Sequence, residues 1–87
     1  MTNTKLLEKL RNLTSRTDNV DKEHIKALHK VLRKLKKRQQ KLVEERLQVE
    51  TDHDRQKIDQ EIEVLQVQRR KGIEVYKQLK KEREDRR

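Results

Sequence analysis

The sequence predicts an all-α protein, in which a short N-terminal helix precedes a long antiparallel helical hairpin that pairs with a second copy. Three observations lead to this fold class. The chain has no Pro and a single Gly, so it lacks the turn residues that a sheet of short strands needs. Charged residues make up 47% of the chain and apolar residues 29%, a composition that long charged helices share with disordered chains. Apolar residues recur at alternating three- and four-residue steps across residues 20–80, and this period favours helices over disorder.

The first element is a short amphipathic helix with its linker, over residues 1–17. Thr4 is placed to cap this helix, and the polar cluster NLTSRTDN at 12–19 ends its pattern. We expect the apolar face of the helix to cover part of the hairpin that follows. Within residues 5–13 that face consists of Leu6, Leu7, Leu10 and Leu13.

The second element, residues 18–87, is the helical hairpin, and its first arm covers about residues 19–50. Asp18 or Asn19 can serve as the N-cap, and Asp21 would lie beside the positive end of the helix. A stripe with coiled-coil spacing follows, interrupted by Gln39, which we expect to fix the register, and by Arg46. The apolar residues of this stripe form the first half of the predicted helix–helix seam: Ile25, Leu28, Leu32, Leu35, Leu42 and Val49.

The second arm covers about residues 53–85 and carries the other half of the seam. Gly72 is the only glycine of the chain, and a helical glycine costs about 1 kcal/mol relative to alanine. In a hairpin Gly72 would face Val31 or Leu32, so a close approach of the two helices explains it, with a kink as the alternative. The seam residues of this arm are Ile58, Ile62, Leu65, Gly72, Tyr76 and Leu79, interrupted by Arg69.

A turn near residues 51–53 separates the two arms. Val49 and Ile58 are nine residues apart, which is 2.5 helical turns, so in a continuous helix the seam would move to the opposite face. Thr51 or Asp52 can cap the second arm. A continuous rod is the alternative, because the eleven residues from Leu47 to Ile58 fit a hendecad step. In the hairpin Arg46 would lie across from Ile58, and its side chain could reach Glu45, Glu50 or Asp54.

The width of the apolar surface predicts a homodimer. Two helices touch along one line, whereas Val31, Val43 and Leu47 widen the stripe of the first arm to about half of its circumference. We expect the N-terminal helix and a second copy to cover the remainder, so that two hairpins form a four-helix bundle. Residues 44–63 hold eight acids and three bases, a net charge of −5. Because the whole chain has a net charge of +9, the other residues together carry +14. This polarity favours an antiparallel dimer over a parallel one.

Residues 26–41 carry eight Lys or Arg and no acid. Many of these cations are four residues apart, where like charges repel by about 0.2–0.5 kcal/mol per pair. In the hairpin a second basic run, residues 69–71, lies at the same level. We call the combined set the basic waist and predict that it binds a polyanion, with a solvated charged surface as the alternative. Its members are Lys26, Lys30, Arg33, Lys34, Lys37, Arg38, Lys41, Arg69, Arg70 and Lys71.

The foremost expected partner is the phosphate backbone of duplex RNA or DNA, because backbone contacts need only cations. Tyr76 is the only aromatic residue and belongs to the seam, so recognition by base stacking is not expected. The alternative function is that of a structural or adaptor coiled-coil protein, which assembles with an acidic or helical protein partner. Attachment to a membrane surface ranks third, since the amphipathic basic helix lacks the Trp and Phe of such anchors.

The sequence contains no pattern that predicts catalysis. It has no Cys, no glycine-rich phosphate loop and no HExxH motif, so we expect a protein that is not an enzyme and uses no cofactor. His24 and His29 are five residues apart and do not share one helix face, and helix capping accounts for the polar run at 52–54, so no metal site is predicted. No apolar segment of 18 residues occurs, so no membrane span is expected and the cytoplasm is the default location.

Overall fold

The computed structural model describes residues 3–15 and 21–85, which form three helices and no strand. These are α1 (Asn3–Ser15), α2 (Lys22–Gln48) and α3 (Asp52–Asp85). The predicted all-α class is therefore confirmed. The molecule is elongated, with principal extents of 54 × 18 × 15 Å.

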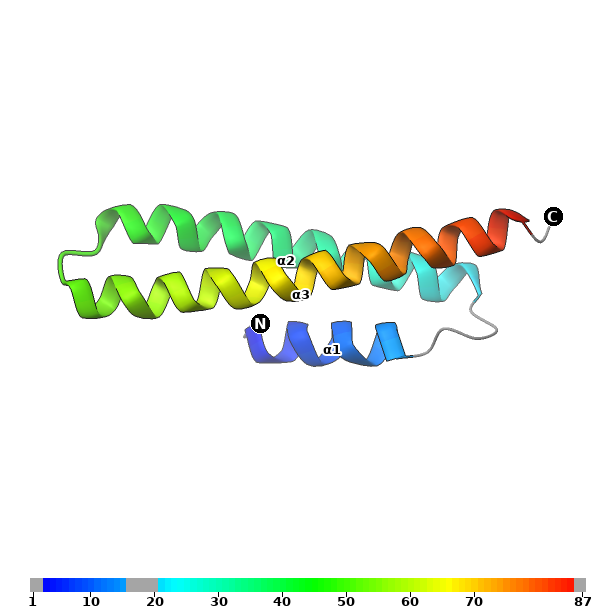
Figure 1. The fold of residues 1–87 in the computed structure, drawn as a ribbon, viewed down its shortest axis with the longest axis horizontal. Helices are drawn as coiled ribbons and strands as arrows, with labels where there is room; N and C mark the ends of the chain where they lie inside the picture. Colours follow the sequence, from blue (N-terminus) through cyan, green and yellow to red (C-terminus); the bar gives the residue numbers. More distant parts are fainter. Residues whose placement is uncertain (1–2, 16–20, 86–87) are drawn as a thin grey trace.

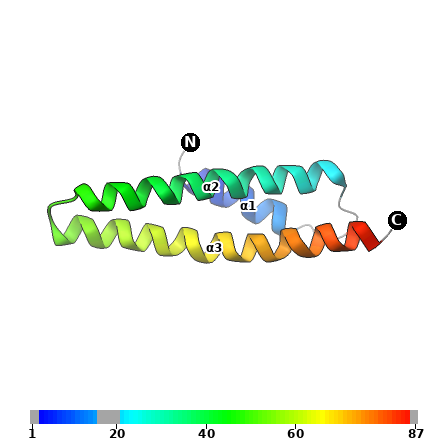
Figure 2. The same ribbon diagram turned by 90° about the horizontal axis from the view of Figure 1, so that it is seen from above.

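The helices α2 and α3 lie side by side along the length of the molecule and run in opposite directions (Figure 1). The shorter α1 contacts both of them over the half of the molecule that is far from the turn, and it runs parallel to α3 (Figures 1 and 2). The half nearer the turn consists of α2 and α3 alone.

The helix starts differ from the predicted ones by a few residues. α1 begins at Asn3, so Thr4 lies inside its first turn and not ahead of it. α2 begins at Lys22 because the Asp21 side chain caps it, accepting a hydrogen bond from the backbone N–H of His24 at 2.8 Å. The predicted caps Asp18 and Asn19 lie outside the described residues.

Residues 49–51 form the turn between α2 and α3, two residues earlier than predicted. Val49 has extended backbone angles (φ −81°, ψ 131°), which end α2 at Gln48. Thr51 is the N-cap of α3, because its Oγ1 accepts a hydrogen bond from the backbone N–H of Asp54 at 3.2 Å. The rod alternative required an unbroken helix here, and the chain is not helical at these three residues.

The core runs along the seam between α2 and α3 and extends under α1. Most of the predicted seam residues are buried: Ile25, Leu28, Leu32, Leu35, Leu42, Leu65, Gly72 and Leu79. The others are half-buried: Val49, Ile58, Ile62 and Tyr76. Leu6, Leu10 and Val31 are also buried, because α1 places its leucines against the α2–α3 pair.

Gly72 lies at a close contact of side chains from the other two helices. A Cβ atom at this position would be 2.8 Å from Leu32 Cδ2 and 2.8 Å from Leu10 Cδ1. Leu32 is one of the two residues that the sequence predicts opposite Gly72 in a hairpin. The contribution of Leu10 was not predicted, because the sequence does not show where α1 docks.

Near the turn, the ion pair of Arg46 differs from the expectation. Arg46 Nε donates to Asp59 Oδ1 across the two helices, instead of reaching Glu45, Glu50 or Asp54. Both side chains are almost half exposed, so this pair contributes at most about 1 kcal/mol to stability. The pair joins α2 and α3 close to the turn.

Candidate polyanion-binding surface

The seven basic-waist residues of α2 lie on its outward faces. Five of them are exposed to solvent: Lys26, Lys30, Arg33, Lys37 and Lys41. Lys34 and Arg38 are half-buried. Because consecutive members are three or four residues apart, the exposed cations follow the helix axis as a ridge.

A shallow hollow of about 280 Å³ marks the middle of this ridge. His29, Lys30, Arg33, Lys34 and Lys37 line it, and all of them belong to α2. The lining contains four cations and no acid, and residues 26–41 as a whole contain no acid. Fixed positive charges of this density attract anions such as phosphate groups.

The three waist residues of α3 do not join that ridge. Arg69 is half-buried in the seam, where its Nε has no hydrogen-bond partner among the described residues. Lys71 lines a groove between α1 and α3, and Arg70 is exposed. Successive residues of a helix point about 100° apart, so three consecutive cations cannot share one face. The expected convergence of the two basic runs holds for their level along the axis, and not for one common surface.

Two cations of α1 lie on the flank of that helix opposite the groove toward α3. In α1, Leu7 and Arg11 line the groove toward α3. Lys5 and Lys9 are exposed and, at 100° per residue, fall on the opposite flank of the buried leucines, which is the flank over α2. They carry a recognisable sequence signal, a lysine pair four residues apart beside a leucine stripe, but their position depended on where α1 docks.

A second basic hollow of about 280 Å³ lies at the open end of the α2–α3 pair. Its cations come from the start of α2 and the end of α3: Lys22, Lys26, Lys80 and Arg83, with Glu84 as the one acid of the lining. Ile25 and Tyr76 supply its apolar part. Only Lys26 belongs to the predicted waist. The others could have been found by pairing the two ends of the hairpin, since residues 22–26 face residues 78–82 in the predicted register.

The histidines and the tyrosine take structural positions. The rings of His29 and Tyr76 stack across α2 and α3, with centroids 5.4 Å apart and an interplanar angle of 28°. His24 Nε2 lies 2.6 Å from the backbone oxygen of Leu13 and so ties the end of α1 to the start of α2. Because Tyr76 is half-buried and stacked on His29, its ring is not free to receive a nucleic-acid base.

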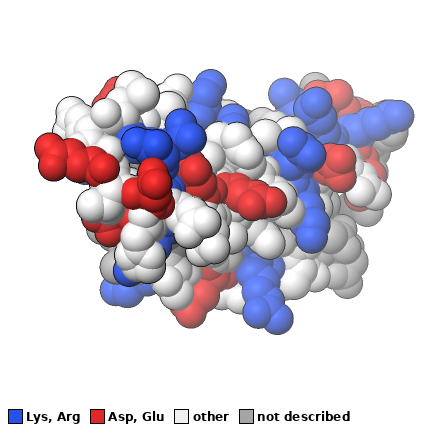
Figure 3. Space-filling model, turned by 60° about the vertical axis from the view of Figure 1, so that its left-hand side comes forward, with Lys and Arg blue, Asp and Glu red and all other residues white. Residues whose placement is uncertain are grey.

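The acidic side chains gather around the turn end, as Figure 3 shows with that end brought forward. Ion pairs occur there, between Arg46 and Asp59 and between Arg55 and Asp52 (3.7 Å). Within residues 3–15 and 21–85, no helix is long and apolar enough to cross a membrane. The same residues contain no group of three or more potential metal ligands close together.

Comparisons of the chain with protein-family models, with curated proteins and with solved structures find no match.

Proposed function

We propose that this protein is a non-enzymatic binding protein whose partner is a polyanion, foremost the phosphate backbone of duplex RNA or DNA. The observation that carries the proposal is the acid-free hollow on α2, lined by Lys30, Arg33, Lys34 and Lys37. In α3, by contrast, several Lys and Arg have an acid four residues later, such as Arg55 with Asp59 and Lys57 with Glu61. Residues 26–41 contain no acid that would offset the like-charge repulsion, and a bound polyanion would reduce it.

Backbone contacts explain the residues present. Each Lys or Arg that neutralises a phosphate releases condensed counterions, so binding is strong at low salt and weakens steeply as salt rises. Lys5 and Lys9 of α1 extend the same surface on its α1 side. Since Tyr76, the only Phe, Tyr or Trp of the chain, is stacked on His29, a duplex suits this surface better than a single strand.

We propose further that α2 and α3 form an antiparallel hairpin in solution and that two copies associate into an antiparallel homodimer. The acidic turn end of each copy would then lie near the basic residues of the other. Two copies together supply four long helices, two from each hairpin. A nucleic-acid partner is compatible with the cytoplasmic location expected from the sequence.

The first experiment is a fluorescence-anisotropy titration of labelled duplex RNA and duplex DNA at several salt concentrations. We expect binding whose logarithmic salt slope falls by about 1.8 in Lys30→Gln/Lys37→Gln, since two phosphate contacts are lost. Lys77→Gln/Lys81→Gln, with the same change of charge on α3, is the control and should keep the wild-type slope. The proposal is wrong if the wild type binds neither duplex at low salt.

In that last case, the alternative function of an adaptor for an acidic protein becomes the better one. It uses the same α2 ridge but a partner whose carboxylates do not release condensed counterions to the same extent. An acidic protein would also discriminate little between the ridge and the basic open end, whereas a duplex backbone requires cations spaced along a line.

A further inference from the structure

A second stripe on α3 faces away from α2. It consists of residues at alternating four- and three-residue steps, which keeps them within about 80° of one another on the helix. At its centre Val64 is 48% exposed and Val67 is 41% exposed, although both are apolar. We call this set the outer stripe; its members, all exposed, are Gln60, Val64, Val67, Lys71, Glu74 and Gln78.

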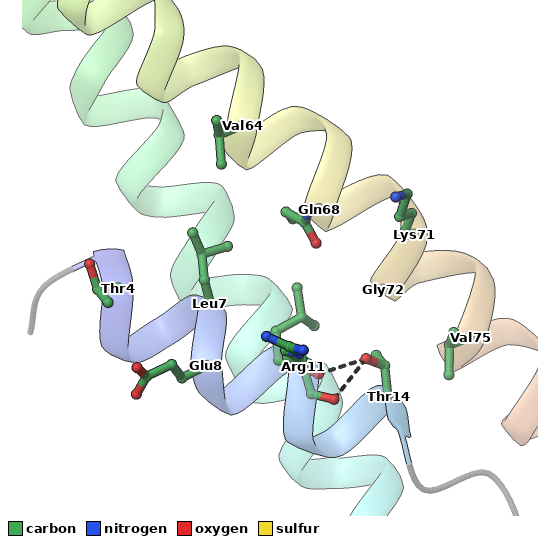
Figure 4. A pocket seen from close by; sticks show the side chains of 11 residues that line it. Thr4, Leu7, Glu8, Arg11, Thr14, Val64, Gln68, Lys71, Gly72 and Val75 are labelled. Atoms are coloured by element: carbon green, nitrogen blue, oxygen red, sulfur yellow. Dashed lines mark hydrogen bonds between the residues drawn. The ribbon is translucent and has the colours of Figure 1, made fainter.

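The outer stripe borders a groove of about 540 Å³ between α1 and α3. Leu7 extends from α1 toward α3, and Val64 and Val75 extend from α3 toward α1, so the groove has apolar walls (Figure 4). Arg11 of α1 and Lys71 of α3 also line it, against one acid, Glu8. An occupant of this groove should therefore be an apolar helix face flanked by acids.

We infer that the occupant is α3 of a second copy, packed antiparallel to the first with a two-fold axis between Val64 and Val67. This inference rests on the homodimer proposed above and names its interface. In this register, residues whose numbers add up to 131 face each other. Val64 of each copy meets Val67 of the other at the centre, and Lys57 meets Glu74 further out.

Charge complementarity selects the second copy and the antiparallel orientation. The α3 segment that enters the groove comes from the acidic turn region, so Glu61 of the second copy approaches Lys71. A parallel arrangement would instead place Lys71 beside Lys71 and Glu74 beside Glu74, and would bring the two acidic turn ends together. Because each copy uses the same surface in this two-fold contact, the assembly stops at two copies.

The geometry sets the expected strength. The two α3 helices overlap over residues 53–78, which is about 38 Å of helix. The apolar contact at the centre is limited to two valines of each copy and Leu7 beside them. We therefore expect a reversible dimer with a micromolar dissociation constant, whose formation leaves the basic ridge of α2 exposed on both copies.

Sedimentation equilibrium of the full chain tests the interface. Val64→Gln/Val67→Gln should weaken dimerisation about tenfold or more, since four valines lose their apolar contacts in each dimer. Val43→Gln/Leu47→Gln is the control, because it changes another exposed apolar pair, which lies on α2 outside the inferred interface, and it should leave the dissociation constant unchanged. Circular dichroism checks that both variants keep their helices.

A charge exchange tests the register. Lys57→Glu and Glu74→Lys should each weaken the dimer, and the variant with both changes should recover most of the affinity. Because the chain has no cysteine, fluorophores can be attached through His53→Cys and Gln78→Cys. Two labels at position 53 should lie about 38 Å apart, whereas position 53 of one copy and position 78 of the other should be adjacent.

The outcomes separate the two proposals. If the protein is monomeric at every concentration, the homodimer and its interface are both wrong. If it dimerises but Val64→Gln/Val67→Gln has no effect, or if two labels at position 53 are adjacent, the dimer stands and the interface inferred here is wrong.

Discussion

Gly72 of α3 lies where side chains of α1 and α2 meet. Its missing Cβ leaves the space that Leu10 Cδ1 and Leu32 Cδ2 occupy. In an isolated helix, alanine at this position would be better by about 1 kcal/mol. In this core, the added methyl group would overpack two buried leucines, a change that typically costs about 1–3 kcal/mol. The packing cost is the larger of the two.

We therefore predict that Gly72→Ala lowers the unfolding free energy by about 1 kcal/mol, which in a chain of this size lowers Tm by about 4–8 °C. Thermal unfolding followed by circular dichroism gives the measurement. In a Leu10→Ala background, which removes one of the two contacts, the same substitution should cost less. A higher Tm for Gly72→Ala with unchanged oligomer size would show that close packing does not explain the glycine.

Two polar residues of the seam illustrate a limit of sequence reasoning at this scale. Spacing correctly assigns Gln39 and Arg69 to the seam, where both are half-buried. It does not predict that Gln39 Oε1 and Arg69 Nε would be buried without hydrogen-bond partners among the described residues. Buried polar atoms of this kind lower stability. They also favour the one α2–α3 register in which the rest of each side chain reaches solvent.

Among the helices, α2 and α3 could be predicted well and the docking of α1 could not. The seam spacing requires two long helices with a break between them, and the break moved by two residues because Thr51 caps α3 and not Asp52. The leucines of α1 predict an apolar face, but several faces of the α2–α3 pair could receive it. The burial of Val31 and the contact between His24 and Leu13 show which face of the pair α1 occupies.

The docking of α1 should depend on Leu10 more than on its neighbour Leu7. A helix of 13 residues is marginal on its own, so α1 is helical because it is packed on α2 and α3. Leu10 is 3% exposed, and its replacement by alanine should cost about 2–5 kcal/mol. We predict that Leu10→Ala makes the amides of α1 exchange with solvent much faster while those of the α2–α3 seam stay protected.

Hydrogen exchange read by mass spectrometry resolves this difference. Leu7→Ala is the control, because Leu7 is only half-buried and should change α1 exchange less. Equal acceleration in all three helices would mean that α1 is part of one cooperative core with the others, and not a separately docked element.

For the whole molecule, the charge map could be predicted along the chain but not around the helices. The acidic turn end and the basic remainder follow from counting residues, and Figure 3 shows the acidic end as expected. The basic waist is predicted only from the positions of its residues along the hairpin axis, without their direction around each helix. Rotation by 100° per residue distributes Arg69, Arg70 and Lys71 over three directions, and the docking of α1 brings Lys5 and Lys9 toward α2 instead. A surface is thus harder to predict than a seam, because it depends on every helix at once.

The excess of positive charge should make the free energy of unfolding rise with salt concentration. In a molecule stabilised mainly by surface ion pairs, salt would lower it instead. Five like-charged pairs at four-residue spacing within residues 26–41 of α2 amount to about 1–2.5 kcal/mol of repulsion. Raising the ionic strength from 0.01 to 0.15 M shortens the Debye length from about 30 to about 8 Å and removes part of it. We predict a gain of about 1 kcal/mol, which is a Tm rise of about 4–8 °C, measured where the protein is monomeric.

Lys30→Gln/Lys37→Gln eliminates four of the five pairs, so its Tm should be higher at low salt and nearly independent of salt. Lys77→Gln/Lys81→Gln, which leaves those pairs intact, should keep the wild-type salt dependence. A Tm that falls with salt in the wild type would mean that ion pairs such as Arg46–Asp59 outweigh the repulsion on α2, and the main physical reason for a polyanion partner would be lost.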